Sequence, residues 1–425
     1  MKNSFKLFAI VMTMAVPAVA MAVQPTEEIR QMASNYYAYP YNDSNAPKQT
    51  PAPEGYRPFH IEHYGRHGSR WHLYADKYKN AIEYLLPAER NDKLTPRGKE
   101  LLAQLREIER ESRGRDGELT QLGARQHRGI ARRMFRNFPE VFSGRACVNA
   151  RSSVSVRCIL SMANELQELT AHNPRLRVNS DASIADMWYI IYQDSVSKDA
   201  AKLGREALGQ YHKNHWPSNS FIEKLVTDRR FAKDSIDIHK LRRSLMDVAF
   251  NAQSHDDMSA PYDIFSYDDI YNTWLCSNAN WFIDNGNSRL TDGLAPYSQR
   301  YLLNNIILSA DTAVISGKPG ANLRFGHEVV VLPLAVLMEL GDYGQEINDL
   351  EEVAEKWRNY EIFPMAGNIQ LVFYKPVSVE GPVLVKALLN EREMKLPTDD
   401  QSMYPYYKWN ELRGYYQEKL QRVPL

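Results

Sequence analysis

Three segments that lie far apart in the chain share one pattern: a short apolar strand, a polar turn and an amphipathic helix. They begin at FHIEHYG (59–65), GRACVNARSSVSVRCILSMANELQEL (144–169) and GANLRFGHEVVVLPLAVLMELG (320–341). Strands that alternate with helices form parallel sheets with helices on their faces. We therefore predict an α/β core in which these strands pair and their polar turns meet at one edge of the sheet.

Capping residues mark several expected helices. Thr95 and Thr120 each precede an amphipathic stretch, and Pro96 fits a first helical position. We expect both of these helices to pack on the sheet. A further helix is expected over 75–86, and two more strands over 368–375 and 382–391.

The turns of the second and third units also carry boundary residues. Ser152 or Ser153 is placed to cap the helix that holds Arg157 in its first turn. The third helix is expected from about 329 to 340, with Gly341 just past its end. These positions put chemically active side chains at helix N-termini.

The middle of the chain differs from its two ends. Residues 181–296 are rich in Trp, Tyr, Asp and His and show mostly helical spacing, whereas 23–180 and 297–425 carry the strand patterns. We predict an α/β core in two parts, interrupted by an α-helical cap over 181–296. The proline-rich stretch 35–58 is expected to be an ordered, extended lead-in to the first strand.

The first 22 residues have the composition of a signal peptide. Lys2 and Lys6 precede an apolar run that ends in small residues, AVAMA. The run is too short for a stable membrane span, and no cysteine lies near the cleavage point. We expect a soluble periplasmic or secreted protein without a membrane anchor.

The balance of charges excludes some classes of binding partner, and the cysteine count limits the number of disulfides. The chain has 52 basic and 52 acidic residues, which argues against nucleic acid or a membrane surface as partner. Anion binding must therefore be local. The three cysteines, Cys147, Cys158 and Cys276, allow one internal disulfide at most, and buried free thiols are the simpler expectation.

The polar turns concentrate residues suited to a phosphoryl group. If the three strand ends adjoin, one pocket receives three arginines, two histidines and a carboxylate: Arg66, His67, Arg70, Arg157, His327 and Glu328. Guanidinium groups match phosphate oxygens in bidentate fashion. A neutral histidine can attack phosphorus, and a protonated glutamic acid can supply the leaving oxygen with its proton.

Two rival chemistries fit the sequence less well. A metal site could use His60, His63, His67 and His72, but neighbouring arginines oppose a divalent cation, and HEVVV has Val331 where a zincin helix needs its second histidine. A nucleophilic Ser69 lacks the G-x-S-x-G turn and an evident base. The third alternative is that these side chains are simply solvated on loops.

The motifs resemble those of the histidine acid phosphatases. RHGSRWH resembles the family's first block, RSSVSVRCILSMANEL its middle block and FGHEVVV its last block, and GELTQLGARQH is similar to its leading helix. FPMAGNIQL and LLNE are most similar to the multiple inositol polyphosphate phosphatase branch. The likeness covers about residues 59–391, apart from the predicted cap.

The resemblance implies a fold and a set of roles. The fold is a phosphoglycerate-mutase-like α/β core with an inserted helical cap, and no metal or cofactor is expected. The implied nucleophile is His67, the proton donor is Glu328, and the phosphate ligands are Arg66, Arg70, Arg157 and His327. Three residues depart from the usual blocks: His72 replaces a proline, and Val154 and Val156 replace acidic residues. The branch also usually has one residue between its histidine and its acid, whereas Glu328 follows His327 directly.

The resulting hypothesis is an exported phosphomonoesterase that hydrolyses inositol polyphosphates, including phytate, through a phosphohistidine. A broad acid or sugar phosphatase is the nearest alternative. An inactive phosphate-ligand binding protein on the same fold and a phosphohistidine mutase are the others. Release of free phosphate in excess of enzyme separates the phosphatases from the binding protein and the mutase.

Overall fold

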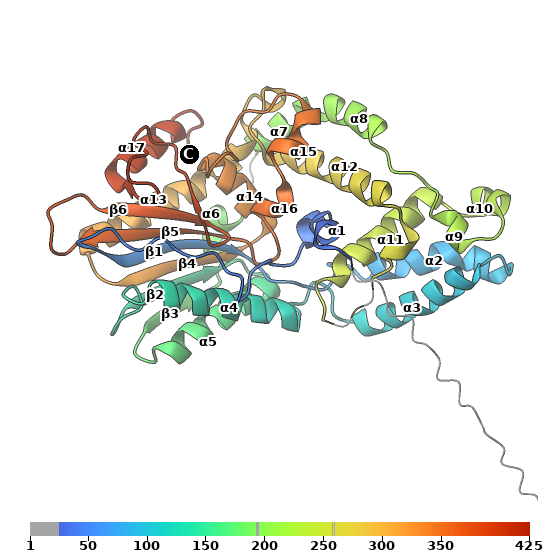
Figure 1. Cartoon of the computed structure of the whole chain (residues 1–425), viewed down its shortest axis with the longest axis horizontal. Helices are drawn as coiled ribbons and strands as arrows, with labels where there is room; N and C mark the ends of the chain where they lie inside the picture. The colour runs from blue at the N-terminus through green and yellow to red at the C-terminus, as the bar shows by residue number, and fades with distance from the viewer. Residues whose placement is uncertain (1–24, 193–194, 257, 259) are drawn as a thin grey trace, which may run out of the picture.

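The computed structural model describes residues 25–192, 195–256, 258 and 260–425 (Figure 1). The predicted signal peptide, 1–22, lies outside the described residues. None of the helices within them is both long and apolar enough to span a bilayer.

An eight-stranded mixed sheet forms the centre of the core, in the order β3-β2-β4-β1-β5-β6-β7, with β8 paired to β6. The first four strands in chain order run parallel, and β5 continues the sheet antiparallel to β1. This confirms the predicted α/β class. The strands are β1 (Tyr56–Arg66), β2 (Cys147–Ser152), β3 (Arg177–Asp181), β4 (Gly320–Gly326), β5 (Asn368–Pro376), β6 (Leu384–Leu389), β7 (Arg392–Met394) and β8 (Tyr407–Lys408).

Helices cover both faces of the sheet because successive strand residues point to opposite sides. On one face α4 and α5 pack over Ile61, Val148 and Leu323, and on the other α13 and α14 pack against β1, with α17 beside α13 (Figure 1). These helices are α4 (Gln121–Asn137), α5 (Val156–His172), α13 (Arg300–Ser316), α14 (Glu328–Leu337) and α17 (Trp409–Leu420).

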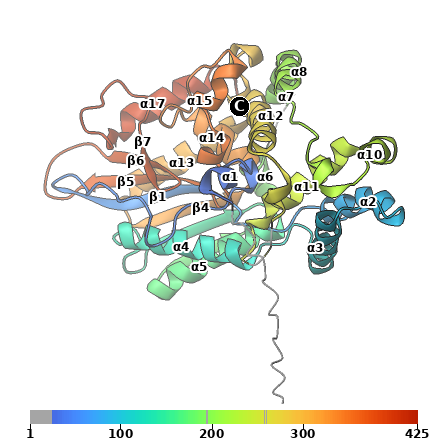
Figure 2. The same ribbon diagram turned by 45° about the vertical axis from the view of Figure 1, so that its right-hand side comes forward.

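A lobe of helices extends from one end of the sheet (Figures 1 and 2). Between Asp181 and residue 296, the described residues contain helices and no strand. The lobe helices are α2 (Asp76–Arg90), α3 (Pro96–Ser112), α7 (Ser195–Leu203), α8 (Arg205–Asn214), α9 (Ile222–Leu225), α10 (Arg229–Ser235), α11 (Ile238–Ala252), α12 (Tyr267–Asn285) and α15 (Val353–Lys356).

The remaining helices are short and lie in the connections between the longer elements. They are α1 (Glu27–Gln31), α6 (Met187–Ile190), α16 (Asn359–Ile362), η1 (Ser34–Tyr36), η2 (Ile184–Asp186), η3 (Tyr262–Ile264), η4 (Arg289–Thr291), η5 (Ala295–Gln299) and η6 (Leu350–Glu352). The division of the chain into a core and a cap over 181–296 stays a prediction, since α2 and α3 also lie beside α9, α10 and α11.

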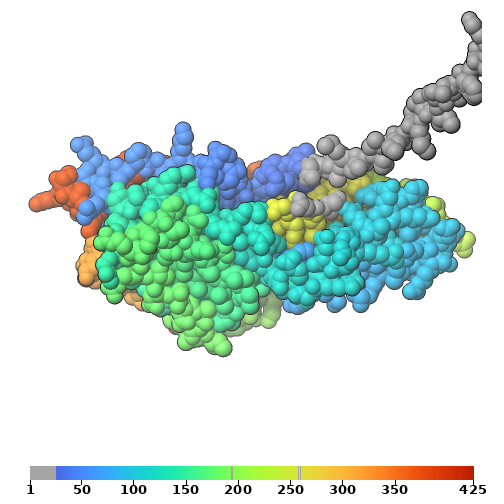
Figure 3. All heavy atoms as spheres, turned by 90° about the horizontal axis from the view of Figure 1, so that it is seen from below, coloured from blue at the N-terminus to red at the C-terminus, as the bar shows by residue number. Residues whose placement is uncertain are grey.

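One helix lies in a different place from the one we expected. The stretch after Thr95 forms α3, but α3 packs on α2 and α9 in the lobe and not on the sheet. Figure 3 shows α2 and α3 at one end of the molecule and α4 and α5 at the other. An amphipathic pattern specifies that one helix face is buried but not which partner covers it.

The threonine caps are confirmed, whereas the serine cap is wrong. Thr95 and Thr120 accept hydrogen bonds from Gly98 N and Gly123 N. The N-cap of α5 is Ser155, not Ser152 or Ser153, and its side chain makes no capping bond. The helix of the third unit ends at Leu337, earlier than expected, because the chain already turns at Glu339, where φ is +52°.

The expectation that the cysteines are buried free thiols is only partly confirmed. All three thiols are free, but only Cys158 is buried, and Cys147 is exposed.

An N-terminal strap, defined here as residues 26–39, lies across the boundary between lobe and core. Residues 37–55 form no helix or strand, but the predicted lead-in over 35–58 begins inside the short helix η1 and ends inside β1, so the prediction is only partly confirmed. Ala38 N donates to Gln253 Oε1 just beyond α11 (3.1 Å), and Met365 N donates to Tyr37 O (2.7 Å). The strap thus bonds to both parts of the molecule.

Candidate active site

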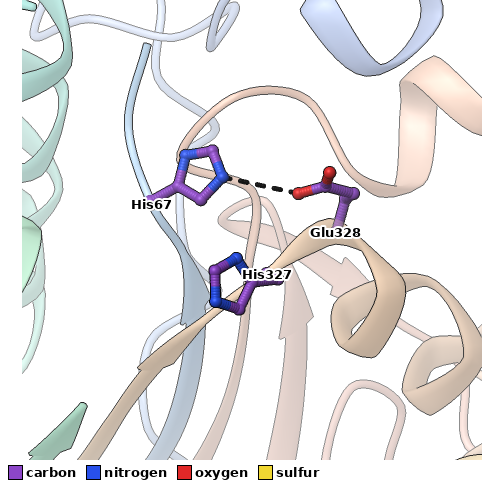
Figure 4. Close-up of side chains that lie close together, drawn as sticks. All are labelled: His67, His327 and Glu328. Atoms are coloured by element: carbon purple, nitrogen blue, oxygen red, sulfur yellow. Dashed lines mark ion pairs between the residues drawn. The ribbon is translucent and has the colours of Figure 1, made fainter. Parts of the chain in front are cut away.

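The carboxyl ends of β1, β4 and β2 meet at one level of the sheet. Arg66 pairs with Gly326, and Ser152 pairs with Phe325, so the residues that follow these strands enter the same region. His67 follows β1, while His327 and Glu328 follow β4 and point toward His67 (Figure 4). The N-termini of α14 and α5 lie at the same edge and favour an anion there.

His67 presents one free ring nitrogen to the site. Its Nδ1 lies 2.9 Å from Gly68 O, and because a carbonyl oxygen only accepts, Nδ1 carries the proton. Its Nε2 has no hydrogen-bond partner among the described residues and lies 3.4 Å from Glu328 Oε2. Burial holds the pKa of His67 well below its usual value; Glu328 opposes this shift, and Arg66 and Arg70 add to it. The ring is therefore neutral, with a lone pair at Nε2.

Arg66 is held by the backbone on both sides. Its Nη1 donates to Phe363 O and its Nη2 to Asn35 O in the strap, each at 2.7 Å. This leaves Nε, which lies 3.3 Å from Glu328 Oε2. Burial lowers the pKa of Arg66 to about 10, so the guanidinium stays charged at neutral pH. Arg66 therefore supplies a positive charge at a fixed position, and its two Nη atoms are already bonded to the backbone.

His327 is oriented by Arg157 and Ser153, and Cys158 Sγ lies 3.6 Å from its Nε2. Arg157 Nη2, from the first turn of α5, donates to His327 Nδ1 (3.4 Å), so the ring proton belongs on Nε2, which lies 3.0 Å from Ser153 Oγ. Burial lowers the pKa of His327 to about 4. The sequence analysis missed Ser153 in this role, although its place just before the helix of Arg157 was a usable signal.

Glu328, the first residue of α14, faces the positive charges. Burial alone would raise its pKa, but the charges of Arg66 and Arg70 outweigh burial and hold the pKa well below the usual value. The carboxyl group is thus ionised before an anion enters.

Several buried polar atoms of this cluster lack a hydrogen-bond partner within the part of the chain that the structure describes. Buried polar groups without partners are uncommon in folded proteins, and their convergence favours a polar ligand. They are Arg66 Nε, His67 Nε2, Arg70 Nε, Arg157 Nε and Glu328 Oε2. A tetrahedral oxyanion has the charge and acceptors to satisfy the three arginines and leave His67 Nε2 facing its centre.

The turn of His67 is packed against α4 and α5. A Cβ at Gly68 would lie 2.6 Å from Gly123 O, so only glycine allows this close approach. Gly68 N donates to Ser161 Oγ (3.1 Å), and Ser161 Oγ donates to Arg157 O (2.8 Å). The nucleophile turn and the helix of Arg157 are therefore connected through one hydroxyl group.

The serine alternative loses support from the geometry. Ser69 is fully buried, and its Oγ accepts a hydrogen bond from Gln126 Nε2 (3.0 Å). No histidine of the described residues bonds to this hydroxyl, so it has no general base.

The four histidines first considered for a metal do not converge. His60 bonds Glu62, His63 lies against Phe325, and His72 bonds Tyr36 and the backbone of α11. Within the described residues, only His67, His327 and Glu328 are spaced to hold an ion. The arginines beside this trio oppose a divalent cation, so the donor set fits an anion better.

No family model matches the chain. Among curated proteins it is similar to multiple inositol polyphosphate phosphatase 1 of Homo sapiens, 25% identical over 340 residues that cover 72% of this chain and 67% of the relative. The Gallus gallus protein of the same name is 24% identical over 322 residues, covering 70% and 68%.

Solved structures give the same fold. The Bifidobacterium longum multiple inositol polyphosphate phosphatase in its apo form superimposes with a TM-score of 0.71 at 17% identity, covering 91% of this chain and 97% of that chain. The phytase from D. castellii gives a TM-score of 0.64 at 14% identity, covering 95% and 88%.

The predicted resemblance and the predicted enzyme class are confirmed by these relatives, which are named as multiple inositol polyphosphate phosphatases and a phytase. Within that class, its similarity in both sequence and fold is to the multiple inositol polyphosphate phosphatases.

Proposed function

We propose that this protein is an exported, metal-independent phosphomonoesterase that hydrolyses inositol polyphosphates through a phosphohistidine on His67. The observation that carries the proposal is the free Nε2 of a neutral, buried His67 inside a group of three arginines. The substrate class rests on the relatives, which are named as inositol polyphosphate phosphatases and phytases.

The proposed reaction has two steps. His67 Nε2 attacks phosphorus, the bond from phosphorus to the ester oxygen breaks, and protonated Glu328 gives its proton to that oxygen. Water then attacks the phosphohistidine, ionised Glu328 takes a proton from the water, the P–N bond breaks, and inorganic phosphate leaves. Arg66, Arg70 and Arg157 balance the charge that develops on the phosphoryl oxygens.

The negative charge of a bound phosphate favours the protonated form of Glu328 that this mechanism needs. Arg66 and Arg70 keep the carboxyl group ionised in the free site, but the negative charge of the phosphate acts in the opposite direction. The complex is therefore expected to bind a proton that the free enzyme does not. A low-pH preference follows from this uptake.

The test is release of inorganic phosphate from phytate, glucose 1-phosphate and an aryl phosphate, each with and without a chelator. We expect turnover on phytate that the chelator does not change. Loss of activity with the chelator would refute the metal-free mechanism, while turnover only on glucose 1-phosphate or the aryl ester would favour the broader phosphatase. Phosphate binding without turnover would favour an inactive binding protein.

Export is tested separately, since it rests on residues 1–22 alone. We expect the expressed full chain to appear in the periplasm or medium, with a new N-terminus near residue 23. An uncleaved cytoplasmic chain would refute this part of the proposal.

A further inference from the structure

His72 connects the helical lobe and the N-terminal strap to the loop of residues 67–72 that follows β1. It is fully buried, and its ring makes two hydrogen bonds: Nε2 with Asp247 O of α11 (2.9 Å) and Nδ1 with Tyr36 OH of the strap (3.0 Å). The carbonyl of Asp247 only accepts, so Nε2 carries the proton. Nδ1 must then accept from the Tyr36 hydroxyl group, and only one tautomer satisfies both bonds.

The Tyr36 ring that His72 fixes is in contact with Arg70. The guanidinium carbon of Arg70 lies 5.5 Å from the centre of the Tyr36 ring, within the range of a cation–π contact. Arg70 Nη1 donates to Trp71 O (2.9 Å), and Arg70 Nε has no partner within the described residues. The position of the Tyr36 ring therefore affects where the free part of this guanidinium lies.

The backbone of the same loop is also attached to the lobe. Asn251 Nδ2, at the end of α11, donates to Arg70 O (3.0 Å), and His72 N donates to Tyr78 OH (3.0 Å), whose own hydroxyl donates to Asn251 Oδ1 (2.6 Å). Since α11 carries both Asn251 and Asp247, one helix fixes the backbone of Arg70 and, through His72, its aromatic neighbour.

We propose that His72 is a positioning residue for phosphate binding, which holds the Tyr36 ring against Arg70 and so aligns this guanidinium with the anion. The proposal rests on the proposed function, because it assumes that Arg70 binds the phosphoryl group. A proline at this position, usual in the related motif, has no side-chain donor or acceptor and could make neither bond. The arrangement is thus particular to a chain with histidine here.

Two substitutions separate the two ring nitrogens. His72→Gln places an amide NH₂ near the former Nε2, so it keeps a donor for Asp247 O and loses the acceptor for Tyr36. His72→Asn places an amide oxygen near the former Nδ1, so it keeps the acceptor and loses the bond to α11. Tyr36→Phe is the matched third variant, because it keeps the ring and removes the hydroxyl group that bonds His72.

The measurement is calorimetric binding of inorganic phosphate to the full chain, together with KM and kcat for phosphate release and the urea midpoint of unfolding. We expect His72→Gln and Tyr36→Phe each to weaken phosphate binding about five- to thirtyfold, the range that corresponds to one cation–π contact. KM should rise more than kcat falls. The double variant should bind no more weakly than either single variant, because both remove the same link.

His72→Asn should keep phosphate affinity within about threefold of wild type, because it retains the acceptor for the Tyr36 hydroxyl group. It should lower the urea midpoint, because it loses the buried hydrogen bond to α11. If the Asn and Gln variants lose affinity equally, or if the double variant is additive, His72 has a structural role only and the proposal is overturned. Phosphate binding without turnover in the wild type would refute the proposed function and leave this test intact. A wild type that binds no phosphate would overturn both.

Discussion

Glu328→Gln should have opposite effects on phosphate binding and on turnover. In the free site Glu328 is ionised and lies 3.3 Å from Arg66 Nε and 3.4 Å from His67 Nε2, so its negative charge is inside the region that the phosphate must enter. Glutamine keeps the shape and removes the charge. The variant should therefore bind inorganic phosphate more tightly and hydrolyse alkyl phosphates more slowly.

The size of both effects can be worked from the geometry. Two unit charges about 5 Å apart at an effective dielectric constant of about 20 repel by about 3 kcal/mol, an upper bound that relaxation reduces. We expect at least a tenfold gain in phosphate affinity, which needs about 1.4 kcal/mol. Loss of a general acid lowers turnover by roughly 10² to 10⁴ on inositol phosphates, and by much less on an aryl phosphate whose leaving group departs without a proton.

Phosphate affinity should increase as the pH falls, because of the protonation of Glu328. The pKa of Glu328 is well below its usual value in the free enzyme. The charge of a bound phosphate should raise this pKa, so binding should take up a proton between the two pKa values. Wild-type affinity should rise as pH falls through the pKa of the complex and level off below the pKa of the free enzyme. The glutamine variant should lack this component.

The assay pairs phosphate calorimetry from neutral to acid pH with turnover on phytate and an aryl phosphate. Glu351→Gln removes an exposed carboxylate that pairs with His215 in the lobe, and serves as the control for charge removal. Weaker phosphate binding in Glu328→Gln would refute the charge argument. Equal turnover losses on the two substrates would mean that Glu328 supports the site without donating a proton.

Three further substitutions address separate parts of the structure. His67→Ala should leave at most a few per cent of turnover, and acid-labile phosphate should no longer be trapped on the chain; an acid-stable phosphoserine at Ser69 would contradict the assignment. Ser153→Ala should raise KM several-fold, because it leaves the buried Nε2–H of His327 without its acceptor at 3.0 Å, a loss of about 1 kcal/mol or more; an unchanged KM would mean that Arg157 and Cys158 orient His327 without Ser153. Glu391→Gln should lower the free energy of unfolding by about 3 kcal/mol in urea titration, since it breaks a buried bidentate pair with Arg133 in which both bonds are 2.8 Å long; a change near zero would show that the bond from Arg133 to Asp43 is sufficient.

The sequence predicted which reactive residues meet at the carboxyl ends of the strands, because these residues stand next to recognisable apolar strands. Arg66 ends an apolar strand, and His67, His327 and Glu328 directly follow one. Parallel strands end at one edge of a sheet, so the proximity of these residues follows from the fold class. Arg157 was found in the same way, through the first turn of its helix.

The supporting contacts could not be predicted because they carry no sequence signal. Arg66 is fixed by the carbonyl groups of Asn35 and Phe363, and any residue type can supply a carbonyl. The prediction that α3 packs on the sheet was wrong for a related reason, since the pattern of its apolar residues does not identify the surface that they cover. Long-range packing decided both.

The anchoring of Arg66 also bears on the order in which the protein folds. The two carbonyl groups that hold its guanidinium belong to Asn35 and Phe363, and β1 lies between β4 and β5, which come more than 250 residues later in the chain. Contacts between such distant residues form late and slowly. A growing chain therefore has its RHGSR motif from the start but no phosphate site, and catalytic competence arises only after most of the polypeptide has been made and β4 and β5 have joined the sheet.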